Sequence, residues 1–367
     1  MWLTEKFSLS LCPEKMKLLV FNPEHDLALA ANLSNFTAPH AGRQLRADLG
    51  FIPAIWAAAD DRVLVENVED AERRFLRLTR HPFGRFIDKT QIRHYDFTAV
   101  DVWGWDLAIR AYLLRWGVDA GVMPTVTQID MIRQLSHRRY AMQLLTSLQM
   151  SGTIGDAIET DQEEAVADRL HSGEHLVVKA PWSSSGRGVR FMNGDMNIYD
   201  SGWLRHIIEK QGSVMVEPYY NKVKDFGMEF VSDGLGSVSC VGLSLFHTSN
   251  GAYTGNILAS KEERENMISS YIPVNLLKTV QQNICVSMGA LLKGHYTGAF
   301  GIDMMVVRRG DGDGFLLHPC VEINLRRTMG HVAISLSEHC SGLPKLMKIE
   351  YCSNVYKLFL TNEKTSY

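Results

Sequence analysis

Residues 177–190 read VVKAPWSSSGRGVR, and they place Lys179 at the end of an apolar run, directly before a loop rich in serine and glycine. A lysine at the end of a buried strand needs an anionic partner. The backbone N–H groups of such a loop can converge on phosphate oxygens. The stretch therefore predicts a phosphate site or, with equal weight, a surface turn beside an exposed lysine. The loop residues of this site are Ser183, Ser184, Ser185, Gly186 and Gly188.

Two carboxylates and an amide fall on two predicted strands that a tight turn joins. Asp303 lies in GIDMMV, and Glu322 and Asn324 lie in VEINL, beyond the turn RRGDGDG. Residues two apart in a strand share a face, so Glu322 and Asn324 project together, and Asp303 joins them if the register is right. Such oxygens suit Mg²⁺, which combines a few protein ligands with substrate phosphates. The adjacent Arg326 and Arg327 favour a metal-phosphate site over a solvent-facing edge strand.

A third polar cluster follows the first apolar strand, at the end of MKLLVFNPEHD. In open sheets of parallel strands, ligands bind outside the carboxyl ends of the strands. The cluster therefore predicts a substrate site or, with equal weight, a capped helix start in which Asp26 serves the first turn. Its residues are Asn22, Glu24, His25 and Asp26.

Alternating patterns of strand and helix place these residues. The segment up to about residue 120 repeats strand then helix, which is typical of an α/β domain with a mainly parallel sheet. ETDQEEAVADRLHSG predicts a helix with a capping box from Thr160 to Glu163 and an end at Gly173. HLVVKAP and VRFM predict a hairpin around the serine–glycine loop, and the following segments are rich in predicted strands.

Two C-terminal features complete the pattern. The loop HTSNGAYTGN contains glycines that allow it to flex, so its polar residues form a candidate acceptor site, with a solvated surface loop as the favoured alternative. These residues are His247, Tyr253 and Asn256. Residues 341–367 become polar, and we expect a frayed tail outside the site.

The composition is that of an ordinary globular protein. The 367 residues are enough for two or three domains, and a net charge of −3 gives no reason to expect nucleic acid or a membrane as partner. Six cysteines without a CxxC pair indicate free thiols in a reducing compartment, so a cytoplasmic location is expected. Residues 1–15 lack a clean signal-peptide core and are interpreted as an extension.

The order of the motifs resembles the ATP-grasp superfamily. The resemblance rests on Lys179 at a strand end, SSSGRG, VEPYY, GIDMMV and VEINLRR, and it covers about residues 125–335. The P-loop and the GxGxxG signature are absent. The implied fold class is α/β (α+β), an ATP-grasp fold with an N-terminal α/β pre-ATP-grasp domain. The implied parts are an N-terminal domain at 16–124, a central subdomain at 125–215, a C-terminal subdomain with the metal site at 216–340, and a tail at 341–367.

The resemblance implies how a nucleotide would bind. Lys179 would contact the α- and β-phosphates, and the loop would close over the β- and γ-phosphates. Arg187 in the loop would add charge at the γ-phosphate or, with equal weight, point to solvent. In SHRRYAM, Arg138 or Arg139 would stand where the family more often has a nucleotide-binding lysine. The residues implied at the hinge, where the family meets adenine and ribose, are Val216, Glu217 and Pro218.

The same resemblance implies a metal site and an acyl site. The cofactors would be ATP and Mg²⁺ (or Mn²⁺). Asp303, Glu322 and Asn324 would hold two ions that neutralise charge as the γ-phosphoryl group transfers. Arg326, with Arg327 beside it, would steady an acyl phosphate, because a planar guanidinium holds two anionic oxygens at once.

The implied reaction is ATP-dependent ligation. A small-molecule carboxylate would become an acyl phosphate and pass to an amine or a thiol, with release of ADP and phosphate. One alternative is a kinase of the same fold. Another is a nucleotide-binding protein without turnover, and a third is a carbohydrate- or protein-binding module that ignores ATP.

Overall fold

The N-terminal part contains a small parallel sheet. The computed structural model describes residues 16–78, 84–183, 188–249, 252–310, 312–338 and 345–362. The sheet has the order β3-β2-β1-β4, and all its pairs are parallel, which confirms the predicted α/β domain. Its strands are β1 (Lys17–Val20), β2 (Arg62–Leu64), β3 (Arg85–Ile87) and β4 (Ala99–Val102). Its helices are α1 (His25–Ala31), α2 (His40–Leu49), η1 (Ile52–Ile55), α3 (Val68–Leu78), η2 (Ile92–His94), α4 (Leu107–Trp116) and η3 (Ala120–Val122).

A four-stranded antiparallel sheet follows, in the order β5-β8-β6-β7. It consists of β5 (Ile158–Thr160), β6 (Leu176–Lys179), β7 (Val189–Met192) and β8 (Val214–Pro218). The helices of this region are α5 (Val126–Leu135), α6 (Arg139–Ser147), α7 (Glu163–His171) and α8 (Ile198–Gln211). The predicted hairpin is confirmed as β6 and β7.

The predicted capping box of α7 is wrong. Gln162 is the N-cap, and it makes no side-chain cap bond. Thr160 is the last residue of β5, and its hydroxyl accepts a bond from the Gln162 N–H instead. The predicted end is confirmed, because Gly173 follows the helix with a φ of 87°.

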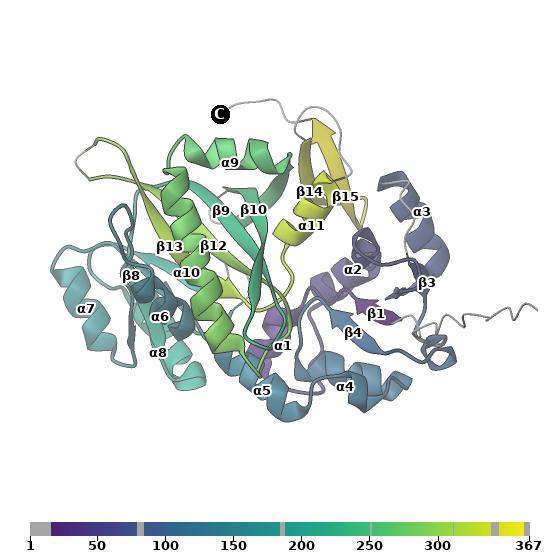
Figure 1. Ribbon diagram of the computed structural model, residues 1–367. Coiled ribbons are helices and arrows are strands. Elements are labelled where there is room, and N and C mark those ends of the chain that lie inside the picture. Colours follow the sequence, from purple (N-terminus) through teal and green to yellow (C-terminus); the bar gives the residue numbers. More distant parts are fainter. Residues whose placement is uncertain are drawn as a thin grey trace, which may run out of the picture.

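The C-terminal half is a seven-stranded antiparallel sheet in the order β13-β12-β9-β10-β11-β14-β15. Its strands are β9 (Lys222–Ser232), β10 (Val238–Ser249), β11 (Ala252–Leu258), β12 (Gly298–Arg308), β13 (Phe315–Asn324), β14 (Lys345–Cys352) and β15 (Val355–Asn362). Its helices are α9 (Lys261–Ser269), α10 (Val274–Leu292) and α11 (Met329–Ser337). In Figure 1 this sheet lies in the middle, between the small antiparallel sheet on the left and the parallel sheet on the right.

The expectation of a frayed tail is wrong for residues 345–362. They form β14 and β15, and Met347 on β14 is fully buried. Leu358 and Leu360 on β15 pack against the N-terminal core, so this hairpin joins the two ends of the chain. The division of the chain into four parts stays a proposal, and β8 spans the boundary drawn after residue 215.

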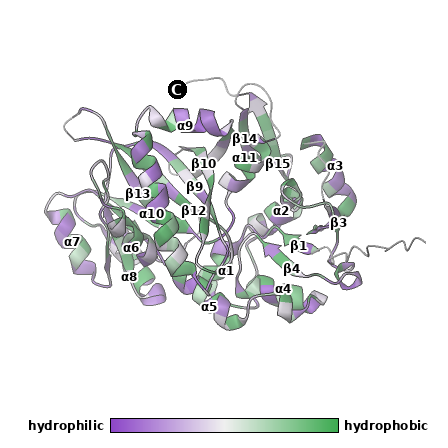
Figure 2. Ribbon diagram, viewed as in Figure 1, coloured by the Kyte–Doolittle hydropathy of each residue, from purple (hydrophilic) through white to green (hydrophobic). Residues whose placement is uncertain are grey.

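Helix α10 shows how sequence pattern becomes packing. Its buried residues recur every three to four positions, at Leu277, Val280, Ile284, Met288 and Leu292. That spacing places them on one face of the helix. The helix crosses the seven-stranded sheet in Figure 1, and Figure 2 shows alternating hydrophobic and hydrophilic bands along the helices. None of the helices within the described ranges is long and apolar enough to cross a bilayer.

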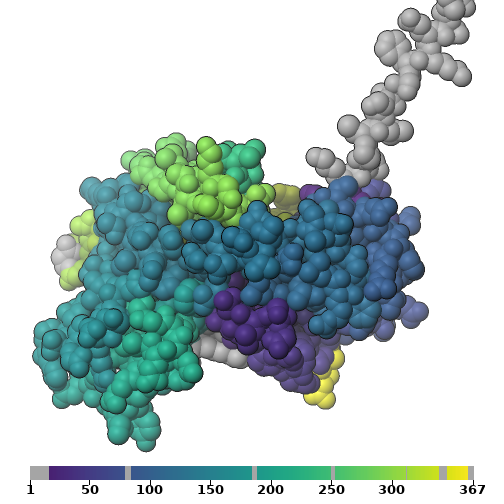
Figure 3. Space-filling model, turned by 90° about the horizontal axis from the view of Figure 1, so that it is seen from below, coloured from purple at the N-terminus to yellow at the C-terminus, as the bar shows by residue number. Residues whose placement is uncertain are grey.

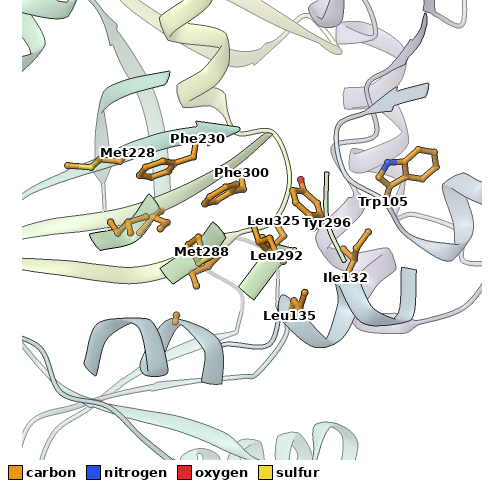
Figure 4. Close-up of a cluster of buried hydrophobic side chains, with 14 of the residues drawn as sticks. Trp105, Ile132, Leu135, Met228, Phe230, Met288, Leu292, Tyr296, Phe300 and Leu325 are labelled. Carbon is orange, nitrogen blue, oxygen red and sulfur yellow. The ribbon is translucent and has the colours of Figure 1, made fainter. Parts of the chain in front are cut away.

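One hydrophobic core runs between the parts of the molecule. Figure 4 shows side chains of this cluster from Met228 and Phe230, past Tyr296 and Leu325, to Trp105 beside the parallel sheet. The small sheet has its own core with α7 and α8. The site residues that follow are therefore held on a continuous packed frame.

We expect Phe300→Ala to lower the free energy of unfolding by about 3 to 5 kcal/mol, because it removes a fully buried ring and leaves a cavity. Phe300 stacks on Phe230 with ring centroids 5.2 Å apart. Urea denaturation measures the loss. The matched control is Phe191→Ala, which removes a ring that is 65% exposed. Losses of the same size in both variants would contradict the assignment of Phe300 to the core.

Candidate functional site

Lys179 lies where the two antiparallel sheets meet. It ends β6, and its Nζ lies 2.7 Å from the Oε2 of Glu217 on β8. The same Nζ donates to the carbonyl oxygen of Val321 on β13 at 3.4 Å, so it connects both sheets. Lys179 is 7% exposed and Glu217 is 9% exposed. The lysine is therefore buried against an acid, and the alternative of an exposed lysine is wrong.

The ends of the serine–glycine loop are tied to the sheets. The N–H of Ala180 donates to the carbonyl of Gly188 at 2.7 Å, and Ser183 Oγ accepts from Arg138 at 3.0 Å. A Cβ at Gly188 would lie 2.3 Å from the Cβ of Ser183, so only glycine fits there. The predicted site residues Ser184, Ser185, Gly186 and Arg187 lie outside the described residues.

The hinge residues differ in what they offer. Val216 is fully buried between β5 and β6, where it pairs with Ile158 and Val178. Pro218 ends β8. Glu217 is the one of the three hinge residues whose side chain pairs with Lys179. The hinge therefore contributes a carboxylate to the space between the sheets.

The predicted metal residues come together as expected. Asp303 on β12 lies directly opposite Glu322 on β13, and Asn324 Nδ2 donates to Asp303 Oδ2 at 3.2 Å. Burial, together with the carboxylates of Glu322 and Glu229, raises the pKa of Asp303 to about 7. A divalent cation would relieve this repulsion between like charges. The expected register of the two strands is confirmed.

The donor set defines which metal could fit. Within the described ranges, no three His, Cys, Asp or Glu side chains are grouped so that they could hold a metal alone. Two carboxylates and one amide oxygen suit Mg²⁺, which takes its other ligands from phosphate and water. These side chains therefore fit a metal that arrives with a phosphate ligand.

Of the two candidate arginines, Arg138 points into the site. Its Nη2 donates to Glu322 Oε1 at 2.6 Å, and it also bonds the carbonyl of Ala180. Arg139 points to the other side, where its Nη2 donates to Glu159 Oε1 at 2.5 Å, and its side chain is 46% exposed. Of these two arginines, Arg138 is thus the one that contacts a predicted metal residue.

Arg326 is held by an acid from the far end of the chain. Its Nε and Nη2 donate to the two oxygens of Asp26 at 2.7 and 2.8 Å, and Nη2 also donates to Asn324 Oδ1 at 2.9 Å. Burial opposes ionisation of Asp26, but Arg326 outweighs it, so the pKa of Asp26 falls below its usual value. Arg326 therefore stands beside the metal residues as predicted.

Arg327 points away from these residues. Its Nη2 donates to Asp101 Oδ2 at 2.6 Å, and its guanidinium lies 4.4 Å from the centre of the Trp56 ring. Its backbone N–H donates to the carbonyl of Trp103 at 2.8 Å. These contacts anchor the end of β13 to the N-terminal sheet.

Some residues of the N-terminal cluster make buried structural contacts, and one contacts the candidate site. Asn22 Nδ2 and His25 Nδ1 lie 3.2 and 3.1 Å from Asp106 Oδ2, and all three residues are nearly fully buried. Asp106 also caps α4, since its Oδ1 accepts from the Ile109 N–H. Glu24 pairs with Arg46 at 2.7 Å, and burial raises the pKa of Glu24. Within the predicted cluster, Asp26 is the member that contacts Arg326.

The alternative of a helix start is confirmed in part, because α1 begins at His25 and has Asp26 in its first turn. Glu24 occupies the N-cap position of α1 and makes no side-chain cap bond. Asp26 instead turns its carboxylate toward the guanidinium of Arg326. Figure 3 shows the purple N-terminal segment on the surface, between the blue segments that follow it in the chain and the teal central region.

A small, partly open pocket lies at this junction. Helix α1, the segment before the serine–glycine loop and the end of β13 all contribute to its wall. Charged groups of both signs face it. The lining residues are His25, Asp26, Leu29, Ser136, Arg138, Pro181, Trp182, Ser183, Glu322, Ile323, Asn324, Leu325 and Arg326.

The candidate acceptor residues do not line this pocket. The Tyr253 hydroxyl bonds Asn256 Oδ1, and Asn256 Nδ2 donates to the Leu245 carbonyl at 3.4 Å. Asn256 is 1% exposed, and burial raises the pKa of Tyr253. His247 is half-buried on β10. Asn256 is therefore a buried strand residue rather than part of a solvated loop, and residues 250–251 lie outside the described ranges.

The sequence analysis missed a buried acid beside the predicted metal residues. Glu229 on β9 is 2% exposed, and it accepts bonds from Ser244 Oγ at 2.7 Å and Thr328 Oγ1 at 2.8 Å. His331 Nδ1 lies 3.0 Å from the same carboxylate. A Cβ at Gly330 would collide with the Glu229 carboxylate, so this glycine is required. The sequence signal that could have revealed Glu229 is the presence of an acid within the apolar run GMEFV.

Comparisons with known proteins give similarity in structure alone. No protein-family model and no curated protein matches the sequence. N5-carboxyaminoimidazole synthetase from Staphylococcus aureus, complexed with ADP, is 12% identical with a TM-score of 0.49, over 92% of this chain and 83% of that one. A putative ATP-grasp superfamily protein from Archaeoglobus fulgidus is 10% identical with a TM-score of 0.48, over 95% and 100%. Biotin carboxylase from Campylobacter jejuni is 14% identical with a TM-score of 0.48, over 92% and 77%.

We expect the Asp26–Arg326 pair to show a coupling energy of about 1 to 3 kcal/mol in a double-mutant cycle, because the pair is bidentate and largely buried. Asp26→Asn, Arg326→Gln and the double variant are compared by urea denaturation. The matched control is the Glu163–Arg205 pair, in which Arg205 is 65% exposed. Its coupling should stay below about 1 kcal/mol. Equal coupling in both pairs would contradict a special role for Asp26.

Proposed function

We propose that the protein is an ATP- and Mg²⁺-dependent ligase that activates a small carboxylate for attack by an amine or a thiol. One observation carries the proposal. Two antiparallel sheets bring the pair Lys179–Glu217 against the group formed by Asp303, Glu322 and Asn324. The order of these motifs along the chain is the one that resembles the ATP-grasp superfamily.

Two cations of the site are paired with carboxylates in the free protein, and phosphate can compete for them. Lys179 pairs with Glu217, and Arg138 pairs with Glu322. A triphosphate carries more charge than either carboxylate, so it competes for both cations. When Arg138 turns to phosphate, Glu322 is released toward Asp303. Nucleotide binding would therefore complete the oxygen site in the same step.

Asp303, Glu322 and Asn324 would hold Mg²⁺ (or Mn²⁺). When bound, the ion neutralises charge on the transferring phosphoryl group. The role of the protein is to place two carboxylates on adjacent strands at one register. Arg138, buried beside them and bonded to Glu322, adds a positive charge that the phosphate can meet.

The carboxylate substrate would bind in the pocket beside Arg326. Its oxygen attacks the γ-phosphorus, ADP leaves, and an acyl phosphate forms. The amine then attacks the acyl carbon, the C–O bond to phosphate breaks, and the amine loses a proton. Arg326 orients the acyl phosphate, while the N-terminal helix α1 and the segment before the serine–glycine loop keep water from it.

We expect ATP with Mg²⁺ to raise the midpoint of thermal unfolding, since a ligand that binds only the native state stabilises it. Lys179→Ala should weaken ATP binding by about tenfold or more, because it removes a charge-assisted bond. ADP, GTP and ATP without metal are measured beside it. Lys210→Ala, on the exposed end of α8, is the matched control and should bind as the wild type does.

The products then separate a ligase from a kinase. We expect ADP and inorganic phosphate together only when a carboxylate and an amine or thiol are both present. A phosphorylated small molecule without free phosphate would instead assign a kinase. No rise in the midpoint at millimolar ATP would contradict the nucleotide site itself.

A further inference from the structure

His318 is a fully buried histidine whose ring nitrogens have no hydrogen-bond partner within the described part of the chain. It lies on β13 and is 0% exposed. Among the described residues, neither Nδ1 nor Nε2 has a donor or acceptor within reach. Buried polar groups in folded proteins are nearly always bonded, so each exception calls for a physical reason.

The imidazole is held firmly in this position. The Tyr220 ring meets it edge to face, with centroids 5.6 Å apart. A Cβ at Gly155 would come within 2.8 Å of His318 Nε2, and Gly155 has a φ of 143°. The Gly155 backbone therefore closes one side of the imidazole, and the Tyr220 ring covers another.

His318 is also neutral and close to the phosphate lysine. Burial lowers the pKa of His318 to about 3, and the charge of Lys179 lowers it in the same direction. A neutral imidazole carries one N–H donor and one acceptor nitrogen. It is thus a group that can bond an uncharged ligand in either direction.

The surroundings indicate which part of a ligand would reach it. Tyr220 follows the hinge that carries Glu217, and His318 precedes the metal residues on the same strand. Lys179 and Asp303 mark where the phosphates would lie. A nucleotide that extends from them toward the hinge would bring its base to Tyr220 and His318.

We propose that His318 hydrogen-bonds the base of the bound nucleotide, with Tyr220 moving aside as the base enters. The inference rests on the proposed nucleotide site. A purine edge offers ring nitrogens that accept and, in adenine, an amino group that donates, so it matches a neutral imidazole. The same bond removes the unsatisfied polar atoms from the interior.

Two variants and two ligands test the inference. His318→Leu keeps the volume and removes both nitrogens, and His318→Gln keeps a donor and an acceptor. Calorimetry compares Mg-ATP with Mg-tripolyphosphate, which has the phosphates but no base. We expect His318→Leu to weaken ATP by about tenfold and to leave tripolyphosphate unchanged, while His318→Gln recovers part of the loss.

Stability without ligand gives an independent result. Because the unsatisfied nitrogens cost free energy, His318→Leu should raise the unfolding temperature of the free protein while it weakens ATP binding. The control is Leu317→Val at the neighbouring buried position, which should lower stability and leave the ratio of the two affinities unchanged.

Distinct outcomes overturn the two proposals. Unchanged ATP binding in His318→Leu, or equal weakening of ATP and tripolyphosphate, overturns the role of His318 and leaves the nucleotide site standing. Failure of both ligands to bind the wild-type protein overturns the nucleotide site and this inference with it.

Discussion

The structure depends on one constraint, which is that buried cations must meet buried anions. Lys179, Arg138 and Arg326 all lie in the interior, and each contacts a carboxylate from a different element. Leaving one partner of such a pair alone costs several kcal/mol, about 3 to 5 for a fully buried pair. These pairs therefore fix where the sheets and α1 stand relative to one another.

The same constraint makes the site responsive to a ligand. A buried ion pair contributes little net stability compared with apolar packing, so a chain that keeps three of them gains something else. Here the acids are the residues suited to a metal, and the cations are those suited to phosphate. A phosphate ligand that arrives with a metal ion can pair with the cations while the metal pairs with the acids, so no charge is left without a partner.

A site residue can be predicted from the sequence when the interaction that places it lies between residues close together in the chain. Asp303, Glu322 and Asn324 are predicted because strand alternation and a tight turn are local features. Lys179 follows from a strand end and its loop. The roles of Asn22 and His25 are missed, because Asp106, about eighty residues away, decides them. Nothing in the sequence pattern shows that Asp106 lies beside Asn22 and His25 in the folded chain.

Errors in the elements have two causes. A capping box at Thr160 fits the spacing, but β5 takes that residue into a sheet ladder, and tertiary pairing outweighs a local preference. Residues 345–362 do carry a local signal, because KLMKIEYC and VYKLFLTN mix apolar and polar residues in the alternation of half-buried strands. The expectation of a tail gave too much weight to the polar residues at the end of the chain, and the apolar side chains of the hairpin pack against the N-terminal core.

Glu229 and His318 make the final point about the site. Both are buried polar residues near the predicted metal residues. Glu229 accepts bonds at both of its oxygens, whereas the ring nitrogens of His318 have no partner among the described residues. A satisfied network fixes geometry, so Glu229 holds β9, β10 and α11 together behind Asp303. An unsatisfied group carries a free-energy cost that a bonding partner would remove. Glu229 thus supports the predicted site, whereas the ring nitrogens of His318 remain open to a bonding partner.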